Sequence, residues 1–290
     1  MAAFWTRRVL CCRFVRALVV LPTYQEAENI EPVLRRLRAL DPPVHVLVVD
    51  DASPDGTAAR AETAGQALGG VDVLARGGKS GLGSAYRDGF VWGLARGFEA
   101  LVEMDADLSH DPDDVPRLLE ALSDGAGLAI GSRYVPGGAI PSWSFGRRTL
   151  SRAGNLYAGA MLRLPVKDAT SGFRAYRAKV LRGIDLDTVR ADGYGFQIEM
   201  AHRAYEDGAR VVEVPIRFVD RERGTSKMSL HITVEALVLV TWWGLLRAVQ
   251  RSIHRIPAPG HARPVDPLPS RPSHTPLPGD RALPERTASR

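Results

Sequence analysis

Cysteine is almost absent from this sequence. Its 290 residues include two cysteines, the neighbours Cys11 and Cys12. Two adjacent residues cannot link distant segments, so a disulfide-stabilised scaffold is excluded, and such a chain suits a reducing cytosol. The apolar fraction of 45% is ordinary for a globular protein. The length suffices for one large α/β domain with or without tails.

Long hydrophobic runs are also missing. The apolar stretch 9–12 is too short for a signal peptide and is followed at once by arginine, so we expect no secretion signal. The run 236–246 is interrupted by a threonine and falls short of the roughly 20 residues that span a bilayer. We expect a helix over 229–250. It lies either at a membrane interface, which Trp242 and Trp243 would favour, or against the core or a partner.

Positive charge is confined to the two ends. The formal net charge is +5, residues 1–16 hold four arginines and no acidic residue, and residues 251–290 hold seven arginines against three acidic residues. The middle of the chain is therefore mildly acidic, which argues against nucleic-acid binding. The basic ends could meet an anionic membrane surface or simply solubilise the protein. Nine of the residues in 251–290 are proline, so we expect this tail to be disordered.

Between these ends, short apolar runs alternate with helical periodicities. The predicted strands are 17–21, 44–49, 71–74, 98–102, 128–131 and 210–219. The predicted helices are 28–40, 57–68, 84–96, 112–122, 150–162 and 196–206. A polar loop that turns into a strand occupies 168–176. This alternation predicts one α/β domain over 17–228, with a mostly parallel sheet and helices on both faces.

Two carboxylates follow the predicted strand 98–102. Asp105 and Asp107 are two residues apart, and side chains with that spacing on an extended segment point the same way. They would converge beyond the carboxyl end of the strand, where open α/β sheets bind ligands. Paired carboxylates suit Mg²⁺ or Mn²⁺ held together with substrate phosphates. The alternative is a polar loop before the helix that begins near Pro112.

A glycine-rich loop, 76–83, resembles two phosphate-binding motifs without matching either. A P-loop would need glycine at Val73, and a dinucleotide fingerprint would need glycine at Tyr86. We therefore expect neither an ATP site nor a dinucleotide-dependent oxidoreductase. Lys79 in this loop remains a candidate contact to a nucleotide.

Charged residues also follow the other predicted strands, and the carboxyl ends of the strands share one crevice in a doubly wound sheet. Acidic side chains there can accept hydrogen bonds from a nucleoside, and arginines can clamp a phosphate through paired charged bonds. The alternative for each arginine is a surface ion pair. The candidates are Glu26, Asp50, Asp51, Asp55, Arg133, Arg147 and Arg148.

Several motifs in a fixed order resemble one enzyme family. They are 20–30 (VLPTYQEAENI), 48–57 (VVDDASPDGT), 104–110 (MDADLSH), 131–134 (GSRY) and 170–176 (TSGFRAY). The chain is similar over about 17–248 to dolichol-phosphate and polyprenol-phosphate mannosyltransferases, inverting GT-A glycosyltransferases of family 2. The resemblance implies a GT-A fold and transfer of mannose from GDP-mannose to a polyprenol phosphate. It leaves open a membrane-protein partner, and UDP-glucose or another sugar nucleotide as the donor.

The resemblance also implies roles for individual residues. The residues implied around the donor nucleotide are Pro22, Tyr24, Glu26, Asp50, Asp51 and Asp55. The implied metal ligands are Asp105 and Asp107, with Ser109 at the position where many relatives carry a glutamine ligand. The residues implied near the acceptor phosphate are Arg133, Arg147, Arg221 and Lys227.

The implied chemistry requires no strong general base. A lipid phosphate, with a second pKa of about 6, is already anionic at neutral pH and can attack directly. A divalent metal can neutralise the leaving nucleoside diphosphate. We expect a peripheral enzyme at the cytoplasmic face of a membrane. The remaining alternative is a non-catalytic scaffold that binds sugar nucleotides, against which the intact Asp105 and Asp107 argue.

Overall fold

The computed structural model describes residues 16–220 and 236–246. The chain divides into two units, Met1–Val249 and Gln250–Arg290, of which the second lies outside the described residues. Residues 1–15 of the expected basic extension, the whole expected tail 251–290, and both Arg221 and Lys227 also lie outside the described residues.

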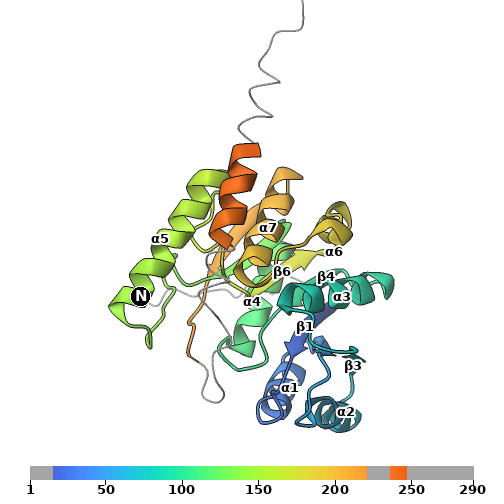
Figure 1. Cartoon of the computed structure of the whole chain (residues 1–290). Coiled ribbons are helices and arrows are strands. Elements are labelled where there is room, and N and C mark those ends of the chain that lie inside the picture. The colour runs from blue at the N-terminus through green and yellow to red at the C-terminus, as the bar shows by residue number, and fades with distance from the viewer. Residues whose placement is uncertain (1–15, 221–235, 247–290) are drawn as a thin grey trace, which may run out of the picture. The chain divides into compact units, whose positions relative to one another are not determined.

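Strands and helices alternate along the chain, as predicted (Figure 1). The strands are β1 (Ala17–Thr23), β2 (His45–Asp50), β3 (Val71–Ala75), β4 (Ala100–Glu103), β5 (Leu128–Ser132), β6 (Arg174–Arg177) and β7 (Val211–Pro215). The helices are α1 (Ile30–Arg38), α2 (Thr57–Leu68), α3 (Leu82–Ala95), α4 (Val115–Ser123), α5 (Phe145–Leu162), α6 (Ala178–Gly183) and α7 (Gly193–Glu206). Short 3₁₀ turns, η1 (Pro112–Asp114) and η2 (Leu186–Thr188), complete the set, and residues 236–246 are helical.

The strands form one mixed sheet in the order β3-β2-β1-β4-β6-β5-β7. Neighbours are parallel except that β6 runs antiparallel to both β4 and β5. The register pairs Thr23 with Asp50, so the carboxyl ends of β1 and β2 lie side by side. The sheet is thus mostly parallel, as the alternation predicted, and its carboxyl-end edge can hold a ligand.

Helices cover both faces of the sheet. Side chains of β1 alternate, so Leu18 and Val20 face α3 and α7 while Val19 and Leu21 face α1 and α4. All four are fully buried, which explains why β1 reads as an unbroken apolar run rather than an alternating one.

Two boundaries and one helix differ most from the sequence-based prediction. Helix α5 begins at Phe145, five residues early, because the Ser144 hydroxyl accepts a hydrogen bond from the Arg147 amide and caps a first turn without apolar periodicity. Strand β7 is shorter than 210–219. Helix α6 was not predicted, since its six residues are too few to show a periodicity.

Helix 236–246 packs against the core along one face and exposes apolar side chains along the other. Ala236 and Val240 are buried, and Val240 belongs to the core cluster under α5 and α7. Trp242 is 58% exposed, whereas Trp243 packs against the core. Within the two described ranges, no helix is long and apolar enough to cross a bilayer.

Candidate active site

A polar cavity of about 270 Å³ opens at the carboxyl-end edge of the sheet. Its walls come from the ends of β1 and β4 and from the starts of α3 and α7. Its lining consists of Pro22, Thr23, Tyr24, Glu26, Asp51, Lys79, Gly81, Leu82, Ala85, Asp105, Ala106, Asp107, Asp192 and Gly193. We call it the polar cavity.

The polar cavity gathers about half of the residues that the sequence singled out. Those lining it are Pro22, Tyr24, Glu26, Asp51, Lys79, Asp105 and Asp107. Those described but not lining it are Asp50, Asp55, Ser109, Arg133, Arg147 and Arg148. The cavity-lining candidates therefore come mainly from the ends of β1 and β4 and the residues that follow them.

Asp105 and Asp107 line the same cavity, but their backbone conformation differs from the extended one that was expected. Strand β4 ends at Glu103, so the pair lies in the turn after the strand, where Leu108 has a φ of +60°. The Tyr86 hydroxyl lies 3.3 Å from Asp105 Oδ1, to which it donates a hydrogen bond. Burial, and then the nearby carboxylates, raise the pKa of Tyr86 well above its ordinary value, so this hydroxyl stays protonated.

His110 and Ser109 support the carboxylate pair from behind. The Asp105 amide donates to His110 Nδ1 at 3.3 Å, and burial lowers the pKa of His110, which keeps the imidazole neutral as this contact requires. The Ser109 amide donates to Asp107 Oδ1 at 3.0 Å. Ser109 is only 3% exposed, so the structure places it beside Asp107 rather than at the cavity surface.

The carboxylate pair fits a divalent cation. Mg²⁺ binds through one or two carboxylates, substrate phosphates and water rather than in an all-protein cage. Asp105 and Asp107 supply two oxygen ligands on one cavity wall, and the Asp105 side chain is 36% exposed. No group of three or more His, Cys, Asp or Glu side chains that could hold a metal occurs in the described ranges. Such a site would therefore need ligands from a substrate.

Asp50 and Asp55 hold loops together. Asp50 is 1% exposed and accepts hydrogen bonds from the Thr23 hydroxyl at 2.8 Å and from the amide and hydroxyl of Ser53 at 2.8 and 2.6 Å. Asp55 accepts from Thr57 and from the Ala27 amide. Burial opposes ionisation, but these hydrogen bonds outweigh it and lower the pKa of Asp55. Both residues fix the β1 and β2 loops that carry cavity-lining groups.

Arg76 and Asp192 are two site residues that sequence reasoning missed. Arg76 lies in the glycine-rich loop and pairs with the cavity-lining Asp51 at 2.6 Å. In the same loop the Lys79 amine lies 4.8 Å from the centre of the Tyr24 ring. Asp192 directly precedes α7 and lines the same cavity, although it lies far from Arg76 in the sequence. The only sequence signal for Asp192 was its position directly before a glycine-rich helix start.

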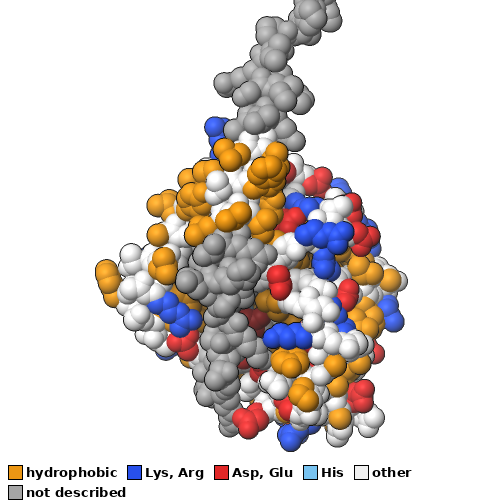
Figure 2. Space-filling model, viewed as in Figure 1, with side chains coloured by type: hydrophobic (Ala, Val, Ile, Leu, Met, Phe, Trp, Pro, Cys, Tyr) orange, Lys and Arg blue, Asp and Glu red, His pale blue; other side chains and the backbone are white. Residues whose placement is uncertain are grey.

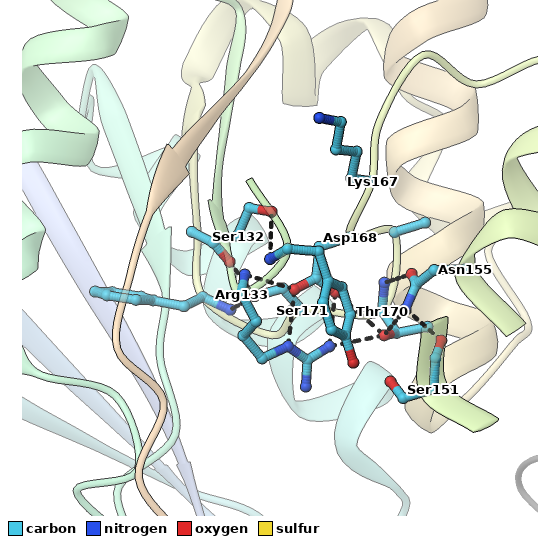
Figure 3. Close-up of polar contacts among 12 residues, drawn as sticks. Ser132, Arg133, Ser151, Asn155, Lys167, Asp168, Thr170 and Ser171 are labelled. Carbon is cyan, nitrogen blue, oxygen red and sulfur yellow. Dashed lines mark hydrogen bonds and ion pairs between the residues drawn. The ribbon is translucent and has the colours of Figure 1, made fainter. Parts of the chain in front are cut away.

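A buried ion pair between Arg133 and Asp168 lies beside the cavity (Figure 3). Arg133 is 6% exposed and donates through Nε and Nη2 to the two Asp168 oxygens at 2.8 and 2.6 Å. Nη2 also donates to the Thr170 hydroxyl at 2.9 Å. Burial alone would lower the pKa of Arg133, but the Asp168 carboxylate raises it above its ordinary value. Asp168 is fully buried, whereas the sequence analysis identified it only as part of the polar loop 168–176.

A second, apolar cavity of about 370 Å³ lies between α5, α7 and helix 236–246. Its lining consists of Trp143, Arg147, Leu150, Ser151, Ala153, Gly154, Tyr157, Ala158, Thr170, Tyr194, Ile198, Ala236, Leu237 and Val240. Arg147 stacks 4.0 Å from the centre of the Trp143 ring and pairs with Asp220 at 3.3 Å. We call it the apolar cavity, and Thr170 links it to the Arg133–Asp168 pair.

Exposed apolar side chains surround the apolar cavity. Figure 2 shows them gathered over helix 236–246 and the adjoining surface. On α5, Phe145, Leu150 and Leu156 are 82%, 68% and 75% exposed. Clustered exposed apolar side chains of this kind are typical of interaction sites.

Comparison with known proteins identifies the family. Residues 18–184 match the family described as Glycosyl transferase family 2. The chain is 54% identical over 231 residues to the undecaprenyl-phosphate mannosyltransferase of Micrococcus luteus, covering 80% of this chain and 95% of that protein. It is 49% identical over 238 residues to the polyprenol monophosphomannose synthase of Mycolicibacterium smegmatis, covering 82% and 90%.

A solved structure shares the fold. Glucosyl-3-phosphoglycerate synthase from Mycobacterium tuberculosis, in complex with Mn²⁺, uridine diphosphate and phosphoglyceric acid, superposes with a TM-score of 0.60 at 22% identity. The match covers 79% of this chain and 78% of that one. The mixed sheet, its helical layers and this likeness confirm the GT-A fold predicted from the motifs. The extent of the family match and the identity to its relatives establish that this chain belongs to glycosyl transferase family 2.

Proposed function

We propose that the protein transfers mannose from GDP-mannose to a polyprenol phosphate, with inversion at the anomeric carbon. The observation that carries the proposal is the adjacency of two unlike cavities, one lined by carboxylates and one by apolar side chains. A nucleotide sugar is polar and anionic, whereas a polyprenol is a hydrocarbon with a charged head. The names of the two bacterial relatives support mannose as the transferred sugar and a polyprenol phosphate as the acceptor.

The donor would occupy the polar cavity. Asp105 and Asp107 would hold Mg²⁺ or Mn²⁺, which when bound would neutralise the charge that develops on the departing diphosphate. The Ser109 amide keeps Asp107 oriented toward the ligand. Glu26, Asp51 and the Lys79 amine provide polar contacts for the nucleotide. Pro22 and Tyr24 form the wall between them, while Asp50 and Asp55 hold the supporting loops.

The acceptor would approach from the apolar cavity. Its hydrocarbon would lie among the apolar side chains of α5 and helix 236–246, and its phosphate would meet Arg147 at the rim and Arg133 at the boundary. Two of the donor groups of Arg133, Nε and Nη2, already bind Asp168, so its Nη1 is the group available to a phosphate. Arg221 and Lys227 follow Asp220, the partner of Arg147, and belong to the same proposal. The lipid phosphate is anionic near neutral pH, so these cations need only position it.

The protein would work at the surface of a membrane, on its cytoplasmic face. A long-chain acceptor keeps its hydrocarbon in the bilayer while the head group enters the site. The exposed apolar side chains of α5 and helix 236–246 surround the mouth of the apolar cavity and suit insertion into the interface. Peripheral attachment of this kind is weakened by carbonate. Attachment that resists carbonate would point instead to an integral membrane protein or a membrane-protein partner.

The test is a transfer assay with the full chain. The purified protein is incubated with polyprenol-phosphate vesicles, Mn²⁺ and a panel of radiolabelled sugar nucleotides, and the lipid fraction is analysed for a labelled monosaccharide. We expect label from GDP-mannose, and none when Asp107→Asn replaces the wild type. Label from UDP-glucose but not from GDP-mannose would show that GDP-mannose is not the donor. Absence of lipid-linked label from every donor would overturn the proposed function.

A further inference from the structure

Asp192 is a carboxylate of the polar cavity to which neither the strand-end motifs nor the proposed function assigns a role. It occupies the N-cap position of α7, with extended backbone angles. Its side chain does not cap α7, although aspartate is among the residues preferred for that task. The side chain is therefore committed to something outside its own helix.

Asp192 caps the neighbouring helix instead. Its Oδ1 accepts a hydrogen bond of 2.7 Å from the amide of Gly83, the second residue of α3. The N-cap residue of α3 is Gly81, which has no side chain to satisfy that amide. The contact joins segments 109 residues apart and fixes the orientation of the carboxylate.

Two glycines make room for this arrangement. A Cβ on Gly81, whose φ is +94°, would lie 2.3 Å from Asp192 Oδ2. A Cβ on Gly83 would lie 2.8 Å from the Ala191 carbonyl oxygen. The starts of α3 and α7 can therefore approach closely enough to present Asp192 to the cavity. In the part of the chain that the structure describes, no lysine or arginine forms an ion pair with Asp192 and no donor is bound to Oδ2.

The chemistry of this carboxylate selects the part of a donor that it can bind. An anionic oxygen repels a diphosphate but accepts hydrogen bonds from hydroxyl groups. Helix α7 also runs past Asp105, because Gln197 Nε2 and the Asp105 oxygens both lie within 4 Å of the position that a Gly172 Cβ would take. Asp192 is thus on the helix that adjoins the Asp105 side of the cavity, whereas Asp51 follows β2 on the other side.

We propose that Asp192 binds a hydroxyl group of the donor sugar and thereby positions the hexose for transfer. This inference rests on the proposed glycosyl transfer. Asp192 Oδ1 keeps its hydrogen bond from the Gly83 amide, and Oδ2 accepts a hydrogen bond from the sugar hydroxyl. Asp192 thus binds the sugar, while residues at the ends of β1, β2 and β4 bind the nucleotide and its diphosphate. No proton is transferred and no bond is made by Asp192.

The decisive experiment is a thermodynamic cycle in which Asp192 is mutated and single hydroxyl groups are removed from the donor sugar. Transfer to polyprenol phosphate is measured for wild type and Asp192→Ala with GDP-mannose and with its monodeoxy analogues, one for each hydroxyl. Removing the contacted hydroxyl should lower kcat/KM of the wild type by about 10- to 100-fold, the range for a hydrogen bond to a charged group. The same analogue should cost Asp192→Ala little more, while the other analogues should affect both proteins equally. Affinity for GDP alone should not change.

Two control variants separate binding from folding. Asp192→Asn keeps a carbonyl oxygen for the Gly83 amide but loses the charge, so its Tm should match the wild type while kcat/KM falls. Asp207→Asn removes an aspartate at the other end of α7 and should change neither.

Three outcomes would overturn the inference. Equal sensitivity of Asp192→Ala and wild type to every deoxy donor would reduce Asp192 to a helix cap. A matching loss of GDP affinity would assign it to the nucleotide. A fully active Asp192→Ala would remove it from the site. The first and third outcomes require measurable transfer, and the second is compared with a wild type that transfers the sugar. None can therefore be confused with failure of the proposed function, in which the wild type uses no donor.

Discussion

The polar and apolar cavities are built in opposite ways. In the polar cavity, side chains are held individually: Asp105 by Tyr86, Asp107 by the Ser109 amide and Asp51 by Arg76. The apolar cavity is bounded by the packed faces of α5, α7 and helix 236–246. The first arrangement fixes donors and acceptors in advance, as stabilisation of developing charge requires. The second provides contact area without fixed directions, which suits a flexible hydrocarbon.

The two cavities meet at a continuous set of side chains. His110 accepts from the Asp105 amide and stacks 5.1 Å from Phe173. Its ring also contacts Phe218, and Arg133 lies 5.6 Å from the centre of that same Phe218 ring. The turn that carries Asp105 and Asp107 and the Arg133–Asp168 pair are thus connected through packed aromatic rings. Under the proposed function, the reaction centre would lie where the polar framework and the apolar wall join.

The largest expected effect comes from the polar cavity. Asp107→Asn should lower kcat/KM at least about 1,000-fold, equivalent to about 4 kcal/mol, because a neutral amide is a poor ligand for a hard cation. The Tm should change little. Turnover with Mn²⁺ and GDP-mannose is the measurement, and Asp113→Asn, an exposed carboxylate paired with Arg36, is the control. Substantial turnover by Asp107→Asn would show that this pair does not hold the metal.

The second effect separates two arginines that the sequence treated alike. Arg133→Ala leaves the fully buried Asp168 without its cation, so unfolding free energy should fall by about 3 kcal/mol or more. Arg147 is half-exposed, so Arg147→Ala should cost less than about 1 kcal/mol of stability. It should instead raise the KM for the acceptor more than that for the donor. Denaturant unfolding and substrate titrations distinguish the two. A rise mainly in the donor KM of Arg147→Ala would move this residue to the diphosphate.

The sequence predicted the polar cavity well because its signals are local. An apolar run followed by carboxylates places those carboxylates at a strand end, and parallel strands bring such ends together. Asp105, Asp107 and Asp51 reach one cavity for this reason. Asp105 and Asp107 do not converge through the side-chain alternation of an extended strand, as expected, because both residues lie in the turn after β4.

The remaining site residues depend on contacts between distant segments. Asp168 meets Arg133 across 35 residues, and Asp192 meets Gly83 across 109. Neither contact leaves a periodicity or spacing in the chain. The apolar cavity was equally hidden, because it requires α5 and helix 236–246 to pack together, as in the 2.6 Å hydrogen bond between Tyr157 and Thr241. Both helices were predicted from the sequence, but their packing against one another was not.

A third effect tests a buried charge beneath the polar cavity. Glu103, the last residue of β4, is fully buried, and burial raises its pKa to about 7 although Arg174 opposes this. The folded protein therefore keeps a proton that the unfolded chain releases above pH about 4.5, so this residue makes stability fall as pH rises from about 4.5 to 7. Glu103→Gln should remove that slope and gain stability relative to wild type across the window, by about 3 kcal/mol at pH 7.

Denaturant unfolding at several pH values measures this difference. His110 contributes in the opposite direction, because its lowered pKa makes stability fall as pH decreases below about 6.5. The comparison must therefore be between variant and wild type at each pH rather than along one curve. A difference that is constant with pH would mean that Glu103 ionises as an exposed carboxyl does.

The smallest expected effect concerns the apolar surface. Leu156→Glu on α5 and Trp242→Glu on helix 236–246 each remove an exposed apolar side chain, so binding to anionic vesicles should weaken by roughly 5- to 10-fold, about 1 kcal/mol each. Val91→Glu is the matched control because Val91 is 52% exposed but lies on α3 rather than on α5 or helix 236–246. Trp243→Glu should instead lower Tm, since Trp243 packs against the core. Vesicle cosedimentation and thermal unfolding separate these outcomes. If Val91→Glu weakened binding as much as Leu156→Glu, attachment would follow total surface charge, and the apolar cavity would have no preferred orientation toward the lipid.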